Sequence, residues 1–376
     1  MSTSLSEAYR SSAHPIHLQH IIPLDFSSVR ELPDSHAWTS SLLLDDKPHG
    51  RRGSVIGVGG PIPVIDLADA NVVKLVGRAC ETWGVFQITN HGQPISLLEA
   101  VESESLRLFS LPAEQKLKAL RSPDGATGYG RARITPFFSK LMWHEGFTIM
   151  GSPAEHAHQL WPHNYTRFCG VMDEYQKEMK QLSVRLLRLI LSSLGLARED
   201  LTKWVGPAGE FTQGATTALQ LNSYPACPDP NRTMGLAAHT DTSMFTILYQ
   251  SNTSGLQIFR DGFGWVSVPP LAGALIVNVG DLLQILSNAR FPAVLHRAVV
   301  NRTNQRLSIA YFYGPSTETR IMPLSKLIGP GDPPLYRSLT WKEYIGIKAK
   351  HLYRALSLVR LQQLAPMNGS LDMNDQ

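Results

Sequence analysis

The stretch "GLAAHTDTSM" (Gly235–Met244) places a histidine and an aspartate two positions apart among apolar and small residues. Successive side chains of a strand point to opposite faces, so His239 and Asp241 are predicted to share one face of a half-buried strand. An isolated H-x-D pair is more often a core histidine beside a turn aspartate than a ligand pair. Partners supplied by other parts of the chain decide between these interpretations.

Bulk composition argues against several function classes. The chain has 376 residues, 43% hydrophobic and 18% charged, with a net charge of +4 and no run of like charges. This balance does not favour binding to nucleic acid or to a membrane surface, and no stretch offers the ~18 uninterrupted apolar residues of a membrane span. The first twenty residues lack the apolar core of a secretory signal. Three cysteines without metal-type spacing predict reduced thiols and a cytoplasmic location.

The pattern along the chain predicts four segments. Residues 1–60 form a poorly specified N-terminal arm, and 61–195 form a helical region that includes a long helix near 171–194 with a methionine and leucine stripe. Residues 196–320 consist of short alternating segments separated by turn signals, which is typical of a β-sandwich or barrel. Residues 321–376 form a C-terminal helical segment and tail.

Two further polar pairs have the same spacing as His239 and Asp241. Asn222 and Tyr224 lie at i and i+2 in "QLNSYP", and Arg306 and Ser308 do so in "RLSIAY". A single pair of this kind is usually a solvated face. Three such pairs on otherwise apolar strands suggest one polar pocket inside the sandwich.

A histidine in a largely apolar strand completes a possible metal site. His296 stands in "FPAVLHRAVV", where a buried imidazole needs a partner. With His239 and Asp241 it gives the ligand set of the two-histidine, one-carboxylate facial triad, which binds non-haem Fe(II) and leaves coordination positions open. We therefore interpret these three residues as the metal ligands and the catalytic centre.

A zinc hydrolase could use the same three ligands. Arg306 and Ser308 favour the iron enzyme, because an arginine fork with a neighbouring hydroxyl suits bidentate capture of a carboxylate. An oxygenase that consumes 2-oxoglutarate (2OG) needs such a clamp, whereas a hydrolase with an activated water has no evident need of one. A structural salt bridge would be the simpler interpretation of Arg306 if His296 were absent.

The combined motifs resemble the plant 2OG- and Fe(II)-dependent dioxygenases. "WGVFQITNHG" (Trp83–Gly92) and "NSYPACP" (Asn222–Pro228) are further signatures of that family, and the resemblance extends from about Pro63 to Leu356. It implies a mainly β fold with α elements, a double-stranded β-helix (jelly roll) wrapped by N-terminal and C-terminal helices. It also implies O2 and 2OG as co-substrates and ascorbate as reductant. The residues implied for Fe(II) are His239, Asp241 and His296, and those for 2OG are Arg306, Ser308, Tyr224 and, lining the same pocket, Asn222.

Two segments narrow the resemblance within the family. "SKLMWHEGFTI" (Ser139–Ile149) and "YRSLTWKEYI" (Tyr336–Ile345) are most similar to gibberellin 3-beta-hydroxylases, although His144 stands where a serine is common. The resemblance implies 3-beta-hydroxylation of gibberellin precursors to bioactive gibberellins. The alternatives are another gibberellin-oxidising or flavonoid-oxidising dioxygenase of the family and, outside it, a zinc hydrolase or a non-catalytic jelly-roll binding protein.

Candidates for the substrate pocket follow from local pattern. Phe312 shares a strand face with Arg306 and Ser308 and is expected to reach the same pocket. Arg133 and Lys140 could meet an acid group, although an ordinary surface charge is an equal alternative for both. The side chains expected to form apolar walls are Tyr129, Phe137, Phe138, Met142 and Trp143.

Overall fold

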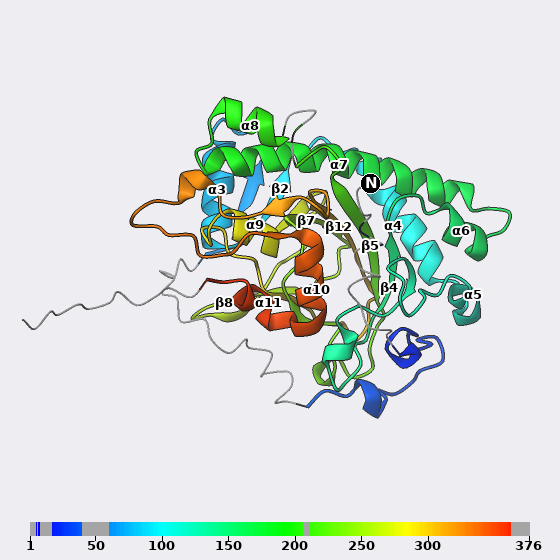
Figure 1. Ribbon diagram of the computed structural model, residues 1–376. Helices are drawn as coiled ribbons and strands as arrows, with labels where there is room; N and C mark the ends of the chain where they lie inside the picture. Colours follow the sequence, from blue (N-terminus) through cyan, green and yellow to red (C-terminus); the bar gives the residue numbers. More distant parts are fainter. Residues whose placement is uncertain are drawn as a thin grey trace, which may run out of the picture.

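The computed structural model describes Leu5, Glu7 and residues 17–39, 60–205, 209 and 211–361. Two β-sheets form its centre, with helices packed around them (Figure 1). The first sheet has eight strands, which lie in the following order: β1 (Val64–Asp66), β2 (Val85–Thr89), β10 (Leu275–Val279), β7 (Phe245–Gln250), β12 (Arg306–Gly314), β5 (Thr216–Tyr224), β4 (Glu145–Ile149) and β3 (Gly128–Gly130).

The second sheet has four strands, in the order β6 (Leu236–His239), β11 (His296–Ala298), β8 (Leu256–Arg260) and β9 (Gly264–Ser267). From β5 to β12 the chain passes repeatedly between the two sheets, and neighbouring strands among β5 to β12 pair antiparallel. At the edge of the larger sheet, β1 and β2 pair parallel. This alternation is the topology of a jelly roll. The predicted fold class is therefore confirmed.

The predicted strand that held both His239 and Asp241 is wrong. The chain leaves the four-stranded sheet at His239 and enters the eight-stranded sheet at Phe245, so Asp241 lies in the crossing segment. Gly280 follows β10 and passes so close to this segment that an added Cβ would clash with the carbonyl oxygen of Ser243. A side chain at position 280 would therefore force the two segments apart.

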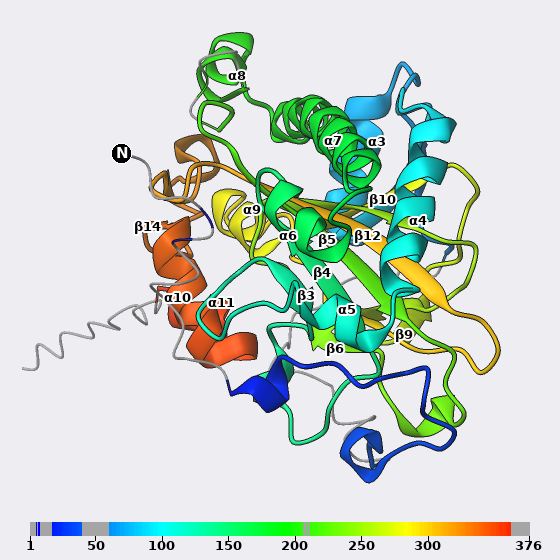
Figure 2. The same cartoon turned by 90° about the vertical axis from the view of Figure 1, so that its right-hand side faces the viewer.

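Helices cover the outer face of the eight-stranded sheet. Figure 2 shows the longest of them, α7 (Thr166–Ser193), beside α3 (Val72–Thr82) and α4 (Ile95–Phe109), with β6 and β9 on the opposite side. The predicted apolar stripe of α7 packs into the core: Met172, Met179 and Leu186 are fully buried. The helix begins at Thr166, earlier than predicted, because Phe168 in its first turn packs against Phe147 of β4 and Trp161.

Shorter helices complete this cover: α5 (Ala113–Leu117), α6 (Ala154–Leu160), α8 (Arg198–Val205) and α9 (Asp281–Leu286). The C-terminal segment contributes α10 (Trp341–His351) and α11 (Ala355–Leu358), preceded by the two-stranded sheet β13 (Arg320–Ile321) and β14 (Leu339–Thr340). Thr340 and Glu343 form a capping box that starts α10. Within the described residues, no helix combines the length and apolar character that crossing a bilayer requires.

The described part of the N-terminal arm lies against the body of the protein. Two 3-10 turns, Leu18–His20 and Asp34–His36, belong to it. The Trp38 indole is 3% exposed, and its Nε1 donates to the Leu141 carbonyl at 2.9 Å. Residues 17–39 are therefore tied to the segment that precedes β4. The boundaries of the four predicted segments themselves stay predictions.

A buried ion pair joins the short helix α5 to the sheet. Lys116 Nζ lies 2.6 Å from Glu145 Oε2, and the Tyr129 hydroxyl donates to the same oxygen at 2.6 Å. Ser223 Oγ donates to Glu145 Oε1 at 3.4 Å. Burial raises the pKa of Glu145, and the Lys116 charge opposes that rise. The carboxylate therefore depends on these donors to stay charged inside the fold.

Replacing Lys116 by methionine is expected to lower the free energy of unfolding by about 3–5 kcal/mol, because it leaves a buried carboxylate unpaired. Urea unfolding at neutral pH measures the effect. The exposed neighbour Lys118 supplies the control, Lys118→Met, which should be near neutral. Adding Glu145→Gln to Lys116→Met should recover part of the loss. A Lys116→Met protein as stable as the wild type would contradict this account.

Candidate active site

A cavity of ≈ 510 Å³ lies against both sheets. The four-stranded sheet contributes His239 and His296 to its wall, and the eight-stranded sheet contributes Asn222, Tyr224 and Arg306. The chain folds this way because β6 and β11 pair with His239 directly opposite His296, while β12 and β5 pair with Arg306 opposite Tyr224. Residues far apart in the sequence thereby meet in one cavity.

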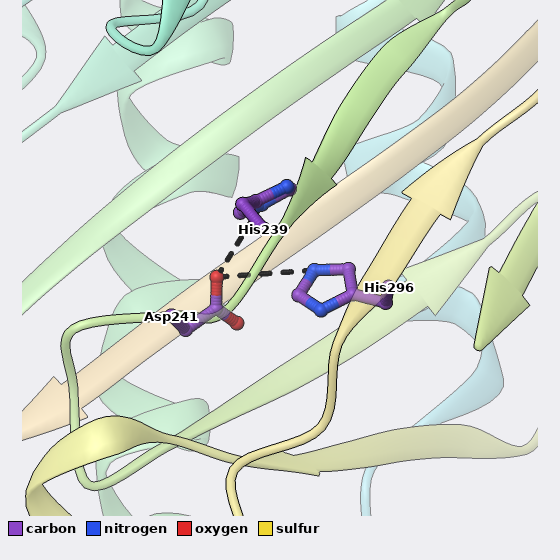
Figure 3. A group of neighbouring side chains, drawn as sticks. All are labelled: His239, Asp241 and His296. Atoms are coloured by element: carbon purple, nitrogen blue, oxygen red, sulfur yellow. Dashed lines mark ion pairs between the residues drawn. The ribbon is translucent and has the colours of Figure 1, made fainter. Parts of the chain in front are cut away.

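Two imidazoles and one carboxylate converge at the first of these walls (Figure 3). His239 Nε2 lies 3.6 Å from Asp241 Oδ1, and His296 Nε2 lies 3.9 Å from the same oxygen. The potential ligand atoms all lie within 4.8 Å of one another. The structure thus brings together the three residues that the sequence predicted as metal ligands.

Hydrogen bonds fix the orientation of each candidate ligand. His239 Nδ1 lies 2.8 Å from the Ala237 carbonyl, and His296 Nδ1 lies 3.1 Å from the Val294 carbonyl. A carbonyl only accepts, so each Nδ1 carries a proton, and in the neutral tautomer that this bond selects, the lone pair is on Nε2. Burial lowers the pKa of His239, and the neighbouring His296 lowers it further by a smaller amount, which keeps the His239 ring neutral.

The carboxylate is oriented in the same manner. Thr246 Oγ1 donates to Asp241 Oδ2 at 2.6 Å, which leaves Oδ1 directed toward the two Nε2 atoms. Imidazoles with anchored Nδ1 atoms and a hydrogen-bonded carboxylate have the supporting contacts that metal ligands have in proteins. The residues present therefore fit a divalent metal ion, and a two-histidine, one-carboxylate donor set facing a cavity suits Fe(II).

A buried arginine stands on the second wall. Arg306 is 1% exposed, its Nη2 donates to Gln250 Oε1 at 2.9 Å, and its Nε is buried without an acceptor among the described residues. The guanidinium lies 5.2 Å from the centre of the Tyr224 ring. Burial lowers the pKa of Arg306, and no described residue forms an ion pair with it. Gly255 leaves room for this side chain, since an added Cβ would lie 2.7 Å from Arg306 Cδ.

A polar chain extends along this wall from Ser308. Asn222 Nδ2 donates to Ser308 Oγ at 3.4 Å, and Asn222 Oδ1 lies 3.0 Å from His144 Nε2. Because the amide oxygen accepts, His144 Nε2 is the donor. Burial lowers the pKa of His144 to about 4, so the ring is neutral. His144 lines the cavity and was not predicted as a site residue; its sequence signal was the departure from the serine common in similar proteins.

The predicted substrate-pocket residues divide into two groups. Arg133, Phe137 and Phe312 line the cavity, as predicted. Five others do not, which corrects the prediction, and each has a structural contact instead. Tyr129 binds Glu145, Lys140 Nζ donates to the Asp34 carbonyl, Met142 Sδ accepts from Ala237 N, Trp143 Nε1 donates to the Pro225 carbonyl, and Phe138 packs on Trp38.

Several lining residues had no clear signal in the sequence. Arg121 and Arg131 reach the cavity from the turns around β3, and Ile345 and Lys348 reach it from α10. Their proximity results from the packing of segments outside the jelly roll. Only the alternation in "WHEGFTI", which places Thr148 on the same face as His144, could have indicated part of this wall.

Two family descriptions match the chain. Residues 215–315 match the 2OG-Fe(II) oxygenase superfamily, and residues 62–165 match the N-terminal region described as "non-haem dioxygenase in morphine synthesis". A protein named gibberellin 3-beta-dioxygenase 1 from Pisum sativum is 56% identical over 375 residues, which is 99% of this chain and 97% of the relative. The chain belongs to the 2OG-Fe(II) oxygenase superfamily.

Other similar proteins agree with this membership. Gibberellin 3-beta-dioxygenase 1 from Arabidopsis thaliana is 50% identical over 360 residues, covering 96% of this oxygenase and 99% of the relative. The crystal structure of JOX2 in complex with 2OG, Fe and JA superposes with a TM-score of 0.75 at 30% identity, covering 90% of this chain and 96% of that one. The crystal structure of a dioxygenase for auxin oxidation in rice superposes with a TM-score of 0.65 at 25% identity. The match covers 80% of this chain and 100% of the rice chain.

The protein is therefore an Fe(II)- and 2OG-dependent dioxygenase. The resemblance stated from the sequence is confirmed, including its similarity to gibberellin 3-beta-dioxygenases. This membership disfavours the zinc hydrolase and the non-catalytic binding protein.

Thr246→Val is expected to weaken Fe(II) binding by roughly 10- to 100-fold, because it removes the hydrogen bond that orients Asp241. Anaerobic calorimetric titration with Fe(II) measures this affinity independently of turnover. Thr303→Val, on an exposed turn, is the matched control. Equal Fe(II) affinity in the two variants would show that the Thr246 hydroxyl does not support the metal site.

Proposed function

We propose that this oxygenase hydroxylates gibberellin precursors at the 3-beta position and so produces bioactive gibberellins. The observation that carries the proposal is the 56% identity, over almost the whole of both chains, to a relative named for this activity. Relatives with the same activity in their names match 96% of the chain at 50% identity. The apolar cavity beside the candidate metal ligands is consistent with a hydrocarbon substrate.

In this proposal His239, Asp241 and His296 hold Fe(II). Iron bound there would supply the activation of O2, coupled to oxidative decarboxylation of 2OG to succinate and CO2. The protein provides two Nε2 atoms oriented by backbone carbonyls and a carboxylate held by Thr246. Because all three residues line the cavity, a metal ion that they held would face it.

The second wall would position 2OG. Arg306 presents a buried, charged fork to the distal carboxylate, Ser308 adds a hydroxyl, and Tyr224 flanks the guanidinium. Asn222 holds Ser308 in place. Burial of these groups excludes water from the clamp and strengthens its attraction for an anion.

The substrate would be held over the metal by the apolar part of the wall. Leu248 and Phe312 project from the eight-stranded sheet, and Leu236 and Leu256 from the four-stranded sheet. Rigid positioning of one carbon near the metal determines which C–H bond is attacked. Ascorbate as the reductant that keeps the iron divalent and a cytoplasmic location are further parts of the proposal.

Arg306→Lys should raise the apparent KM for 2OG by roughly 10- to 100-fold while changing the KM for the gibberellin precursor little. Lysine keeps the charge but loses the bidentate fork, and a hydrogen bond to a charged group contributes about 1.5–3 kcal/mol. Steady-state kinetics with each substrate varied in turn give both constants. Arg302→Lys, at an exposed site, is the control. An unchanged KM for 2OG would place the clamp elsewhere.

Product identification tests the function itself. With Fe(II), ascorbate, 2OG and a gibberellin precursor that lacks the ring-A hydroxyl, the enzyme should add one oxygen at the 3-beta position, as shown by mass spectrometry and NMR. Asp241→Ala should abolish the product. Main attack at the 2-beta carbon would indicate an inactivating gibberellin oxidase, and rapid flavonoid turnover without gibberellin turnover would remove the hormone role.

A further inference from the structure

Two further buried arginines line the same cavity. Arg121 is 3% exposed and Arg131 is 7% exposed, and both contribute to the cavity wall. They lie side by side on the two segments that flank β3, since Arg121 Nη2 donates to the Arg131 carbonyl at 3.0 Å. Neither has a role in the candidate metal site or in the 2OG clamp.

The hydrogen bonds of these arginines leave their charge without a counter-ion. Arg131 Nε donates to the Ile22 carbonyl at 2.6 Å, and its Nη1 is buried without a partner. In the described part of the chain, neither arginine forms an ion pair with a carboxylate. Glu145, the buried acid on the adjacent β4, is already bound by Lys116 and Tyr129.

The surroundings make this wall more positive. Burial lowers the pKa of Arg121 to about 9 and that of Arg131 to about 10, so both remain charged at neutral pH. His144 between the clamp and this wall is neutral. His20 and Arg133 also line the cavity, and neither is an acid. Two buried positive charges without an anion carry a desolvation cost that a bound anion would offset.

The geometry points to a carboxylate subsite at Arg121 and Arg131, which binds the carboxylate of the substrate. This inference rests on the proposed function, and it names the anionic end of the gibberellin precursor as the group recognised. A guanidinium fork matches a planar carboxylate, and the lining beside it, such as Ile134 and Phe137, suits the hydrocarbon skeleton. Arg306 is the separate anion site for 2OG. One cavity thus binds two different carboxylic acids at two arginine sites.

The subsite replaces the earlier sequence-based assignment of an acid-binding role to Lys140. Lys140 Nζ donates to the Asp34 carbonyl and lies outside the cavity wall. It therefore provides a matched control, because it is a cation near the same segment that does not face the cavity.

Binding and kinetics with a gibberellin precursor and its methyl ester test the subsite. Esterification removes the charge and keeps the skeleton. For the wild type, the dissociation constant of the acid, measured by calorimetric titration of the metal-free protein, should be roughly 10- to 100-fold lower than that of the ester. The KM of the acid should be lower than the KM of the ester by a similar factor. Arg131→Gln should remove most of this preference, Arg131→Lys should remove part of it, and Lys140→Gln should leave it intact. The KM for 2OG should stay unchanged in all three variants.

The outcomes separate this inference from the proposed function. Equal binding of acid and ester by the wild type overturns the subsite, whether or not the variants fold. A preference for the acid over the ester that survives in a folded Arg131→Gln protein also overturns the subsite. A raised KM for 2OG in that variant overturns it as well, because it would assign Arg131 to binding of the co-substrate. A wild type that binds and converts neither gibberellin compound overturns the proposed function and, with it, this inference. Conversion of both compounds with equal KM leaves the function standing and removes only the subsite.

Discussion

Two equivalent hydrogen bonds determine the candidate metal site. In His239 and in His296 the ring Nδ1 donates to the carbonyl two residues earlier, Ala237 and Val294 respectively. Each bond selects one tautomer and fixes one ring orientation, so both Nε2 atoms present lone pairs toward the same point. These bonds direct the two rings to the same point only because β6 pairs with β11 in a register that places His239 opposite His296. The jelly roll supplies that pairing, and the outer helices stabilise the sheet that faces it.

Asp241 depends on a different part of the structure, because it lies where the chain crosses between the sheets. Its backbone carbonyl accepts from Asp281 N at 2.8 Å. The Asp281 carboxylate in turn accepts from Lys348 Nζ and from the Tyr344 hydroxyl of α10, each at 2.7 Å. Lys348 also donates to Thr240 Oγ1 at 2.6 Å. Helix α10 therefore braces the crossing segment through a buried ion pair between Lys348 and Asp281, and the position of the Asp241 carboxylate depends on a helix far away in the sequence.

The sequence was sufficient to single out the histidines, the aspartate and the buried arginine that the structure gathers in one cavity, because residue type and spacing on apolar strands restrict what such side chains can do. It did not show that the strand ends at His239 and leaves Asp241 in the crossing segment, because alternation does not reveal where a chain changes sheets. It was also insufficient for most of the substrate pocket. Met142, Trp143 and Lys140 occur in a promising segment, yet their side chains contact Ala237, Pro225 and Asp34. Such contacts result from tertiary packing, which local pattern cannot indicate.

The two groups of polar residues in the cavity wall are consequently built in different ways. The candidate metal site consists of residues on or next to paired strands of the jelly roll, held by backbone carbonyls and by Thr246 of β7. Arg121 and Arg131 are held by the Arg131 and Ile22 carbonyls of irregular segments. Changes in the N-terminal arm or in the turns around β3 can therefore alter the shape and charge of this part of the wall without changing the hydrogen bonds that orient His239, Asp241 and His296. A single metal-binding framework can therefore serve substrates that differ in skeleton and in the position of their acid group.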